Sequence, residues 1–404
     1  MSYSLFEAFG VEIEYMIVDA ATLDVSATAD RLLERVAGEV VSEIELGDIA
    51  WSNELMLHVL ELKTNGPTSS LAGLSQKFHE HVLKANSALA EWNARLMPTA
   101  MHPWMDPLKD SQLWPHEYTA IYHAYDRIFG CQGHGWANLQ SVHLNLPFSN
   151  DEEFGRLHAA IRLLLPLIPA LAASSPIADG QLKPALDYRL EVYRTNSAKI
   201  PSLTGHVVPE CVYTESDYEQ QIFQRLYRDI SPFDPDGILQ HPFLNSRGAI
   251  ARFDRGAIEI RVVDSQECPA ADLAIVAFEV EVLKALVAER WSAFAAQSVL
   301  DTEELSRLLF SVVRDGEQTV ISHRQYLEQF GVTATSMRAG ELCEMLIEEL
   351  QLNQSAWQRE LEVLVSQGPL ARRIRNRLQG GSAADVTSVY RELCDCLSEN
   401  RTFA

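Results

Sequence analysis

Two glutamates alternate with apolar residues inside a strand-like segment near the start of the chain. Phe9–Val18 is rich in β-branched and aromatic residues, as strands are, yet it contains Glu12 and Glu14. Alternate side chains of a strand share a face, so these carboxylates would lie ~7 Å apart. Such charges repel unless a cation lies between them, and a hard divalent cation suits that position. The alternative is a solvated edge strand with an acidic face.

Two further segments repeat this one-sided polarity. Leu55–Lys63 places Glu61 and Lys63 on one face, and Ser141–Pro147 alternates polar and apolar residues around His143. A glutamate within an apolar strand is costly to bury unless it is paired or bound to a metal. Glu61 could simply pair with Lys63, and His143 could be a hydrogen-bonded core residue. The repetition of the pattern favours metal ligands.

The segment Gly256–Asp264 has the strongest pattern of this kind. Glu259 and Arg261 share its polar face, and Arg252 lies shortly upstream. A guanidinium group suits a planar, bidentate grip on a carboxylate or a phosphate. The alternative is a network between Glu259 and Arg261 that holds no ligand.

The arrangement of these segments predicts the fold class. Strands are expected at Glu7–Val18, Leu55–Lys63, Leu96–Met101, Gln140–Leu146, Tyr188–Tyr193 and Ala257–Val263. Helices are expected at Thr68–Arg95, Glu117–Phe129, Asp151–Ala172, Ser216–Arg228, Ala271–Ala295, Ala339–Val365 and Ala384–Leu397. Strands of a parallel sheet that is covered on both faces are nearly continuous apolar runs, whereas these strands keep one polar face. We therefore expect an α+β fold: a mostly antiparallel sheet, helices on its apolar face, a site on the other face, and a helical last third.

Composition limits the partners and the compartment. The chain has 404 residues and a formal net charge of -23, which disfavours nucleic acid and anionic membranes as partners. Its six cysteines are scattered without zinc-site spacing, and we find neither a leader segment nor an apolar run of membrane-spanning length. We expect a cytoplasmic protein with reduced thiols that acts on small molecules and could form a homo-oligomer.

Together, the polar faces predict a metal and phosphate site. Carboxylates and one imidazole would bind two or more Mg²⁺ or Mn²⁺ ions, while arginines would stabilise phosphate oxygens, as in phosphoryl transfer from a nucleotide. Arg189 and Arg194 could serve the same purpose or be surface charges. The sequence has no G-x-x-x-x-G-K-[ST] and no G-x-G-x-x-G motif, which argues against a P-loop or Rossmann site.

The order of these segments resembles the glutamate–cysteine ligase type 2 family, bacterial carboxylate–amine ligases related to glutamine synthetase. The matching pieces span roughly the first two thirds of the chain: Gly10–Glu14, Val59–Thr64, Met101–Pro103, Ser141–Asn145 and Ile258–Asp264. The resemblance implies a single glutamine synthetase-like catalytic domain over residues 1–404, with residues 271–404 as a mainly helical part. It also implies a six-stranded antiparallel sheet that forms the bowl of the active site.

The resemblance also assigns roles. It implies ATP and Mg²⁺ (or Mn²⁺) as cofactors, with Glu12, Glu14, Glu61, His143 and Glu259 at metal positions. Arg261 matches the arginine that holds phosphate or a substrate carboxylate, and Arg194 and Arg252 are further catalytic candidates. The chain departs from the family where Ser141 or Asn145 replaces a second histidine and where Leu146 and Pro147 replace a following glycine.

The function expected on these grounds is an ATP-dependent carboxylate–amine ligase. It would activate a carboxylate, glutamate in the related enzymes, as an acyl phosphate that an amine then attacks. One alternative is a guanidino kinase-like phosphotransferase, which would need more arginines and a nucleophile-orienting cysteine, for which Cys268 is the candidate. Another is a catalytically silent relative that binds metal or nucleotide and supports a partner ligase.

Overall fold

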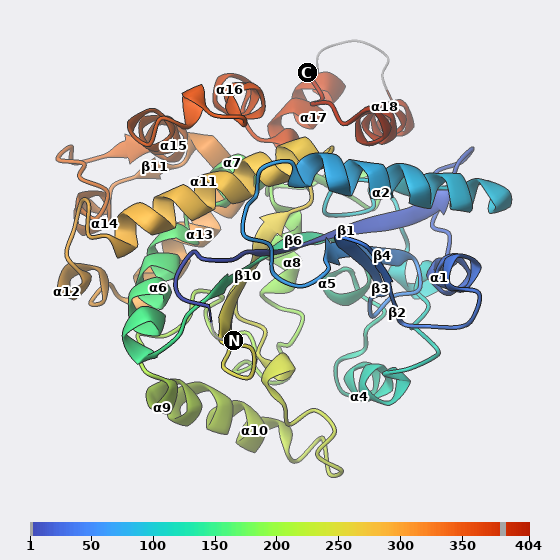
Figure 1. The fold of residues 1–404 in the computed structure, drawn as a ribbon, viewed down its shortest axis with the longest axis horizontal. Helices are drawn as coiled ribbons and strands as arrows, with labels where there is room; N and C mark the ends of the chain where they lie inside the picture. The colour runs from blue at the N-terminus through green and yellow to red at the C-terminus, as the bar shows by residue number, and fades with distance from the viewer. Residues whose placement is uncertain (1–2, 380–384) are drawn as a thin grey trace.

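An antiparallel sheet lies at the centre of the protein (Figure 1). A computed structural model describes residues 3–379 and 385–404, and eight strands within this part form the sheet in the order β2–β3–β4–β1–β6–β10–β9, with β5 also paired to β1. The strands are β1 Gly10–Asp19, β2 Glu43–Leu46, β3 Ile49–Asn53, β4 Val59–Thr64, β5 Ala94–Met97, β6 Ser141–Pro147, β9 Ala249–Arg252 and β10 Ala257–Asp264. The expected antiparallel sheet is confirmed. It has eight strands instead of about six, because β2, β3 and β9 were not predicted and one predicted strand, Tyr188–Tyr193, is a helix.

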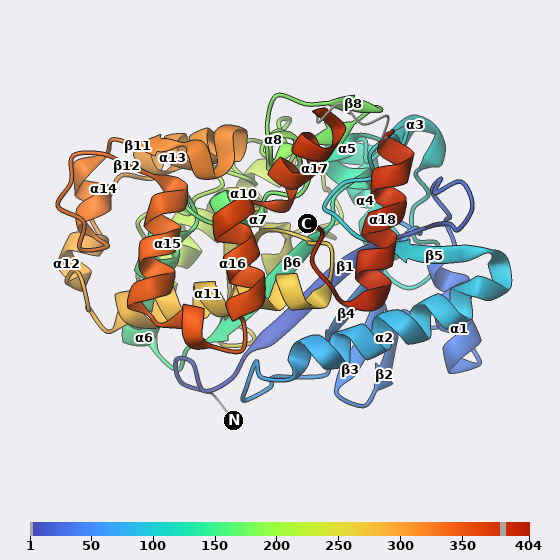
Figure 2. The same ribbon diagram turned by 90° about the horizontal axis from the view of Figure 1, so that it is seen from above.

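Helices cover the apolar face of the sheet in two layers (Figures 1 and 2). The inner layer contains α2 (Leu74–Leu89), α6 (Asp151–Leu164) and α11 (Pro269–Val287), and α11 contacts both of the others. The apolar side chains of the strands pack into the same core cluster as these helices. The helical packing on one face, expected from the one-sided strands, is confirmed.

Helices from the end of the chain form the outer layer, as Figure 2 shows from above. Its outer helices are α15 Ala339–Glu349, α16 Gln358–Gln367, α17 Leu370–Gln379 and α18 Val386–Glu399. Helix α13 (Thr302–Asp315) does not belong to this layer, because it contacts α8 (Tyr188–Tyr193). The helix expected at Ala339–Val365 is therefore two helices, and Gln351 lies between them with a φ of 58°. Ala384, the expected start of the last helix, lies outside the described residues. None of the described helices is both long and apolar enough to cross a lipid bilayer.

The opposite face of the sheet is surrounded by shorter elements (Figure 1). They include α4 Thr119–Phe129, α5 His134–Ala137, α8 Tyr188–Tyr193, α9 Glu215–Tyr218 and α10 Gln224–Ile230. The prediction of a strand at Tyr188–Tyr193 is wrong, because the side chain of Asp187 accepts a hydrogen bond from the backbone N–H of Leu190 and caps a helix there.

A second correction concerns the segment before α2. We expected its helix to begin after Thr68, but Thr68 instead forms a backbone bridge with Phe9. The helix starts at Leu74, directly after Gly73, whose φ of 75° is strained for other residues. The remaining elements are α1 Ala29–Ala37, α3 Pro107–Asp110, α7 Pro169–Ala172, β7 Ile177–Ala178, β8 Gln181–Leu182, α12 Phe294–Gln297, β11 Val320–Ile321, α14 Arg324–Glu328 and β12 Met337–Arg338.

Candidate functional site

The register of three strands assembles an acidic floor on the polar face of the sheet. Glu12 on β1 lies directly opposite Lys63 on β4 and His143 on β6, and Glu14 lies opposite Glu61. Directly opposed residues of an antiparallel pair project to the same side. Side chains distant in the sequence are therefore brought together by strand pairing alone.

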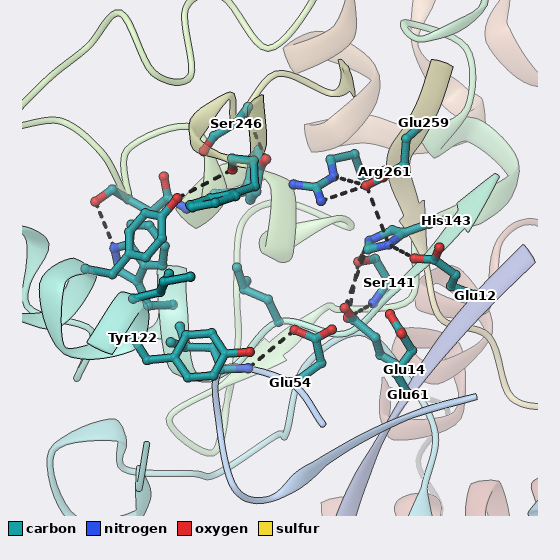
Figure 3. A pocket seen from close by; sticks show the side chains of 18 of the residues that line it. Glu12, Glu14, Glu54, Glu61, Tyr122, Ser141, His143, Ser246, Glu259 and Arg261 are labelled. Carbon is teal, nitrogen blue, oxygen red and sulfur yellow. Dashed lines mark hydrogen bonds and ion pairs between the residues drawn. The ribbon is translucent and has the colours of Figure 1, made fainter. Parts of the chain in front are cut away.

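This floor is the base of a cavity of about 490 Å³, here called the central cavity (Figure 3). The volume lies within the range of small-molecule sites. Among the described residues, the charged side chains that line it are Glu12, Glu14, Glu54, Glu61, Lys63, His143, Arg189, Arg252, Arg255, Glu259 and Arg261. Seven of the eight predicted site residues thus line one cavity.

His143 is the centre of the hydrogen-bond network on the floor. Its Nδ1 lies 3.0 Å from a carboxylate oxygen of Glu12, and its Nε2 lies 2.9 Å from Oγ of Ser141. Ser141 in turn donates its backbone N–H to Glu14 over 2.7 Å, and Asn145 donates to Glu12 over 3.1 Å. Ser141 and Asn145, one of which stands where the family usually has a second histidine, therefore orient the carboxylates.

The crowding of charges shifts the pKa values of several groups. Burial by itself would raise the pKa of Glu12, but the hydrogen bond with His143 and the positive charges around it lower that pKa to about 2. Burial opposes protonation of His143, yet the bond to Glu12 and the charge of Glu14 raise its pKa to about 9. Burial and the charge of Glu12 raise the pKa of Glu61 to about 7. At neutral pH, these pKa values leave His143 protonated, Glu61 about half protonated and Glu12 ionised.

Glu54 joins this floor, although the sequence did not single it out. It is half-buried, and burial together with the charges of Glu61, Glu14 and Glu12 raises its pKa well above the usual range. In Figure 3 it lies between the carboxylates of the floor and Tyr122. The signal that could have found it is the short apolar run Ile49–Trp51, which begins β3; that strand ends at Asn53, directly before Glu54.

The donor atoms fit a divalent cation. Glu12, Glu61 and His143 can each offer a ligand atom so that the three atoms lie within 4.8 Å of one another, and Glu14, Glu54 and Glu61 form a second such set. Carboxylate oxygens are the ligands that Mg²⁺ and Mn²⁺ prefer. A cation there would also remove the repulsion that raises the pKa values of Glu54 and Glu61.

The arginines differ in how they are held. Arg261 donates from Nε to Glu259 over 2.8 Å, and Arg252 donates to the exposed carboxylate of Asp254 over 3.1 Å. Arg194 does not line the central cavity: it pairs with Glu191 on the outer side of α8 and lines another cavity. The structure therefore does not bring Arg194 together with the other predicted site residues.

Arg189, and not Arg194, lines the central cavity. Its side chain is buried, its Nε bonds to Asp264, and its Nη1 donates to the backbone oxygen of Arg261 over 3.3 Å. Its Nη2 has no hydrogen-bond partner among the described residues, and the residue lines the cavity. A buried guanidinium nitrogen without a partner is unusual and favours an anionic ligand.

A break in the strand register positions the partner of Arg189. The pairing of β10 with β6 shifts between Ile260 and Val263, so that Asp264 lies opposite Ser141, on the cavity side. Asp264 also accepts hydrogen bonds from the backbone of Ser174 and from the hydroxyl of Ser175. Sequence alternation alone could not reveal this change of face.

Aromatic side chains form the wall opposite the carboxylates, and the sequence analysis did not predict them. They are Tyr118, Tyr122, Tyr125, Trp136, Tyr193 and Phe243. Backbone carbonyls fix two of them: Trp136 donates to Asn196 over 3.0 Å, and Tyr193 donates to Ser246 over 2.8 Å. Rings held in this way offer rigid apolar faces to a ligand.

Cys268 gives no support to a guanidino kinase. It is fully buried at the start of α11 and is not among the residues that line the central cavity.

Comparison with known proteins places the chain in a family. The family model of glutamate–cysteine ligase family 2 matches residues 8–392, so the chain belongs to that family. An uncharacterised protein of Archaeoglobus fulgidus is 31% identical over 394 residues, which are 98% of this chain and 99% of the relative. A protein of Jannaschia sp. with the provisional name glutamate–cysteine ligase 2 is 27% identical over 190 residues, 46% of this chain and 45% of the relative.

Two solved structures share the fold. The glutamate–cysteine ligase of Francisella tularensis, in complex with AMP, aligns with a TM-score of 0.59 and 13% identity over 99% of this chain and 90% of its own. PafA, the ligase of the prokaryotic ubiquitin-like protein Pup, aligns with a TM-score of 0.51 and 13% identity over 95% of this chain and 71% of its own. At this identity the likeness establishes the fold.

Proposed function

We propose that this member of glutamate–cysteine ligase family 2 is an ATP-dependent carboxylate–amine ligase that forms a γ-glutamyl amide bond. One observation carries the proposal: a floor of metal-competent carboxylates faces several arginines within one cavity of small-molecule size. This combination suits phosphoryl transfer, because catalysis there is mainly positioning and charge neutralisation. The AMP complex of the Francisella neighbour supports a nucleotide as one substrate.

The floor would hold two divalent cations. Glu12, Glu61 and His143 are the ligands proposed for one, and Glu14, Glu54 and Glu61 for the other. When bound, Mg²⁺ or Mn²⁺ would neutralise the phosphate oxygens of ATP and align its γ-phosphoryl group.

The arginines would hold the anionic groups of the two substrates. Arg261 is anchored by Glu259, which keeps its guanidinium group at the cavity wall near the floor. Arg252 lines the same wall, and we propose phosphate contacts for both. Arg189 has an unpartnered Nη2, and we propose that it binds a carboxylate of the amino-acid substrate. We assign Arg194 no part in this reaction.

The proposed reaction has two steps, phosphoryl transfer and then amide formation. A carboxylate oxygen of the substrate attacks the γ-phosphorus of ATP, and the bond to the β-phosphate oxygen breaks to release ADP. The amine nitrogen then attacks the acyl carbon, inorganic phosphate leaves, and the nitrogen loses a proton to a base. The aromatic wall would contact the apolar part of a substrate and exclude water from the acyl phosphate.

The direct test is ADP release from ATP in the presence of Mg²⁺, L-glutamate and a panel of amines. We expect ADP release to depend on both glutamate and one amine, with an amide product of matching mass. Phosphate transfer to a guanidino compound would favour the phosphotransferase. Nucleotide binding without any ADP release would favour the silent relative, and absence of nucleotide binding would refute the ligase.

A further inference from the structure

A second cavity, the outer groove, lies on the other side of α8 from the central cavity. It has a volume of about 740 Å³ and is bounded by α8, by α13 and by the loop at Pro184 and Ala185. Helix α8 therefore forms a wall shared by two cavities: Arg189 and Tyr193 line the central cavity, while Arg194 lines the outer groove. The volume suits a small ligand.

Positive charge is concentrated in the outer groove. Arg194, Arg307 and Arg314 line it, and Glu191 is the acidic residue among its lining side chains. Arg307 is exposed and makes no ion pair or side-chain hydrogen bond with any residue of the part that the structure describes. Arg194 and Arg314 are each paired with one carboxylate, so Arg307 gives the groove a net positive charge. Since the Debye length at physiological ionic strength is about 8 Å, this nearby charge acts on a ligand in the groove more strongly than the distant charges that make up the net -23 of the chain.

Side-chain contacts hold two of these arginines in place. Arg194 is bonded to Glu191, and its guanidinium carbon lies 4.5 Å from the ring centre of Phe310. Arg314 forms an ion pair of 2.7 Å with Asp315. A guanidinium group that is already ordered loses less conformational freedom when it binds an anion.

Backbone contacts tie the walls of the groove together. The backbone N–H of Leu186 donates to the carbonyl of Arg314 over 3.2 Å. Arg375 on α17 donates to the carbonyls of Pro184 and Ala185 over 3.2 and 3.1 Å, which brings a further cation close to the loop. Hydrogen bonds therefore hold the loop of the groove against α13 and α17.

We propose that the outer groove binds a small ligand with two or more phosphate or carboxylate groups. The three guanidinium groups supply charge-assisted hydrogen bonds, and the rings of Tyr188 and Phe310 bound the space between them. A ligand there contacts the outer face of α8. The inner face of that helix carries Arg189 and Tyr193, so the ligand would restrain two residues of the central cavity.

The test uses direct titration of the full chain in metal-free buffer at low ionic strength. The probes are pyrophosphate and tricarballylate, which separate a phosphate ligand from a carboxylate ligand. The variant carries Arg307→Gln and Arg314→Gln. The matched control carries Arg225→Gln and Arg228→Gln on α10, two exposed arginines that pair with Asp229 as Arg314 pairs with Asp315.

We expect at least one probe to bind the natural chain and to bind the groove variant about tenfold more weakly or worse, with the control unchanged. Hydrogen exchange at residues 188–194 should slow when the probe is added to the natural chain and to the control. Absence of binding by both probes, equal weakening in variant and control, or binding without added protection of α8 would overturn the proposal. None of these results depends on ligase activity.

Discussion

Glu279 is a carboxylate buried in the apolar middle of α11. Its side chain has no exposed surface, and neither of its carboxylate oxygens has a hydrogen-bond partner among the described residues. Burial raises its pKa from 4.5 to about 8. Folding therefore keeps this group protonated at neutral pH, where the unfolded chain would ionise it.

The pKa shift sets the size and sign of a pH effect on stability. A carboxyl group whose pKa is raised by folding does not destabilise the protein below pH 4.5, the pKa of the group in the unfolded chain. Above that pH it lowers the free energy of unfolding, and the loss grows until about pH 8. At about 1.4 kcal/mol for each pKa unit, the free energy of unfolding loses about 4 kcal/mol at pH 7.5 but only about 1 kcal/mol at pH 5. The difference of about 3 kcal/mol is the predicted signature.

The substitution Glu279→Gln removes the titration and keeps the shape of the side chain. We expect it to stabilise the protein by about 3 kcal/mol more at pH 7.5 than at pH 5, which corresponds to roughly 4 °C in Tm for a chain of this length. The assay is thermal unfolding followed by circular dichroism at the two pH values. Glu281→Gln is the matched control, because Glu281 lies on the same helix but is part-exposed and paired with Lys284.

Equal shifts of Tm for Glu279→Gln at both pH values would refute the reasoning. That result would mean that Glu279 is ionised in the folded protein and that its environment is polar. A pH-dependent shift of similar size in the Glu281→Gln control would also refute the assignment of the effect to burial.

Three further predictions concern the site. Glu61→Gln should weaken Mn²⁺ binding by about tenfold or more in calorimetry, because both proposed cation sets share Glu61, whereas Glu45→Gln on the exposed face of β2 should leave it unchanged. Arg189→Lys should raise the KM for glutamate by about tenfold or more but leave nucleotide affinity unchanged, since a lysine cannot keep the bond to Asp264 and also reach the ligand; an unchanged KM would contradict the carboxylate contact. Asp264→Asn should lower the stability by about 3 to 5 kcal/mol in urea unfolding, because it leaves the buried charge of Arg189 without its partner; stability close to that of the natural chain would show that Arg189 finds another partner.

Local sequence patterns predicted most of the sheet and the polar floor. In β1, β4, β6 and β10 the alternation of side chains is enough to assign each residue to a face, so the alternation by itself points to Glu12 and His143 as site residues. The pattern failed at Tyr188–Tyr193, where aromatic and branched residues favour a strand. A helix forms there instead, because Asp187 caps it and no strand among the described residues pairs with this segment.

The tertiary structure alone decided which charged groups meet. Sequence alternation tells which residues share a face, but the register between strands, and so the placement of Glu12 opposite both Lys63 and His143, depends on packing over the whole sheet. Glu54 reaches the floor from a loop, and a bulge in β10 turns Asp264 toward Arg189. Neither can be recognised from the alternation of polar and apolar residues, because a loop has no regular alternation and a bulge interrupts that of a strand. The sequence by itself thus determined an antiparallel sheet with one acidic face, and the fold determined the set of side chains gathered on it.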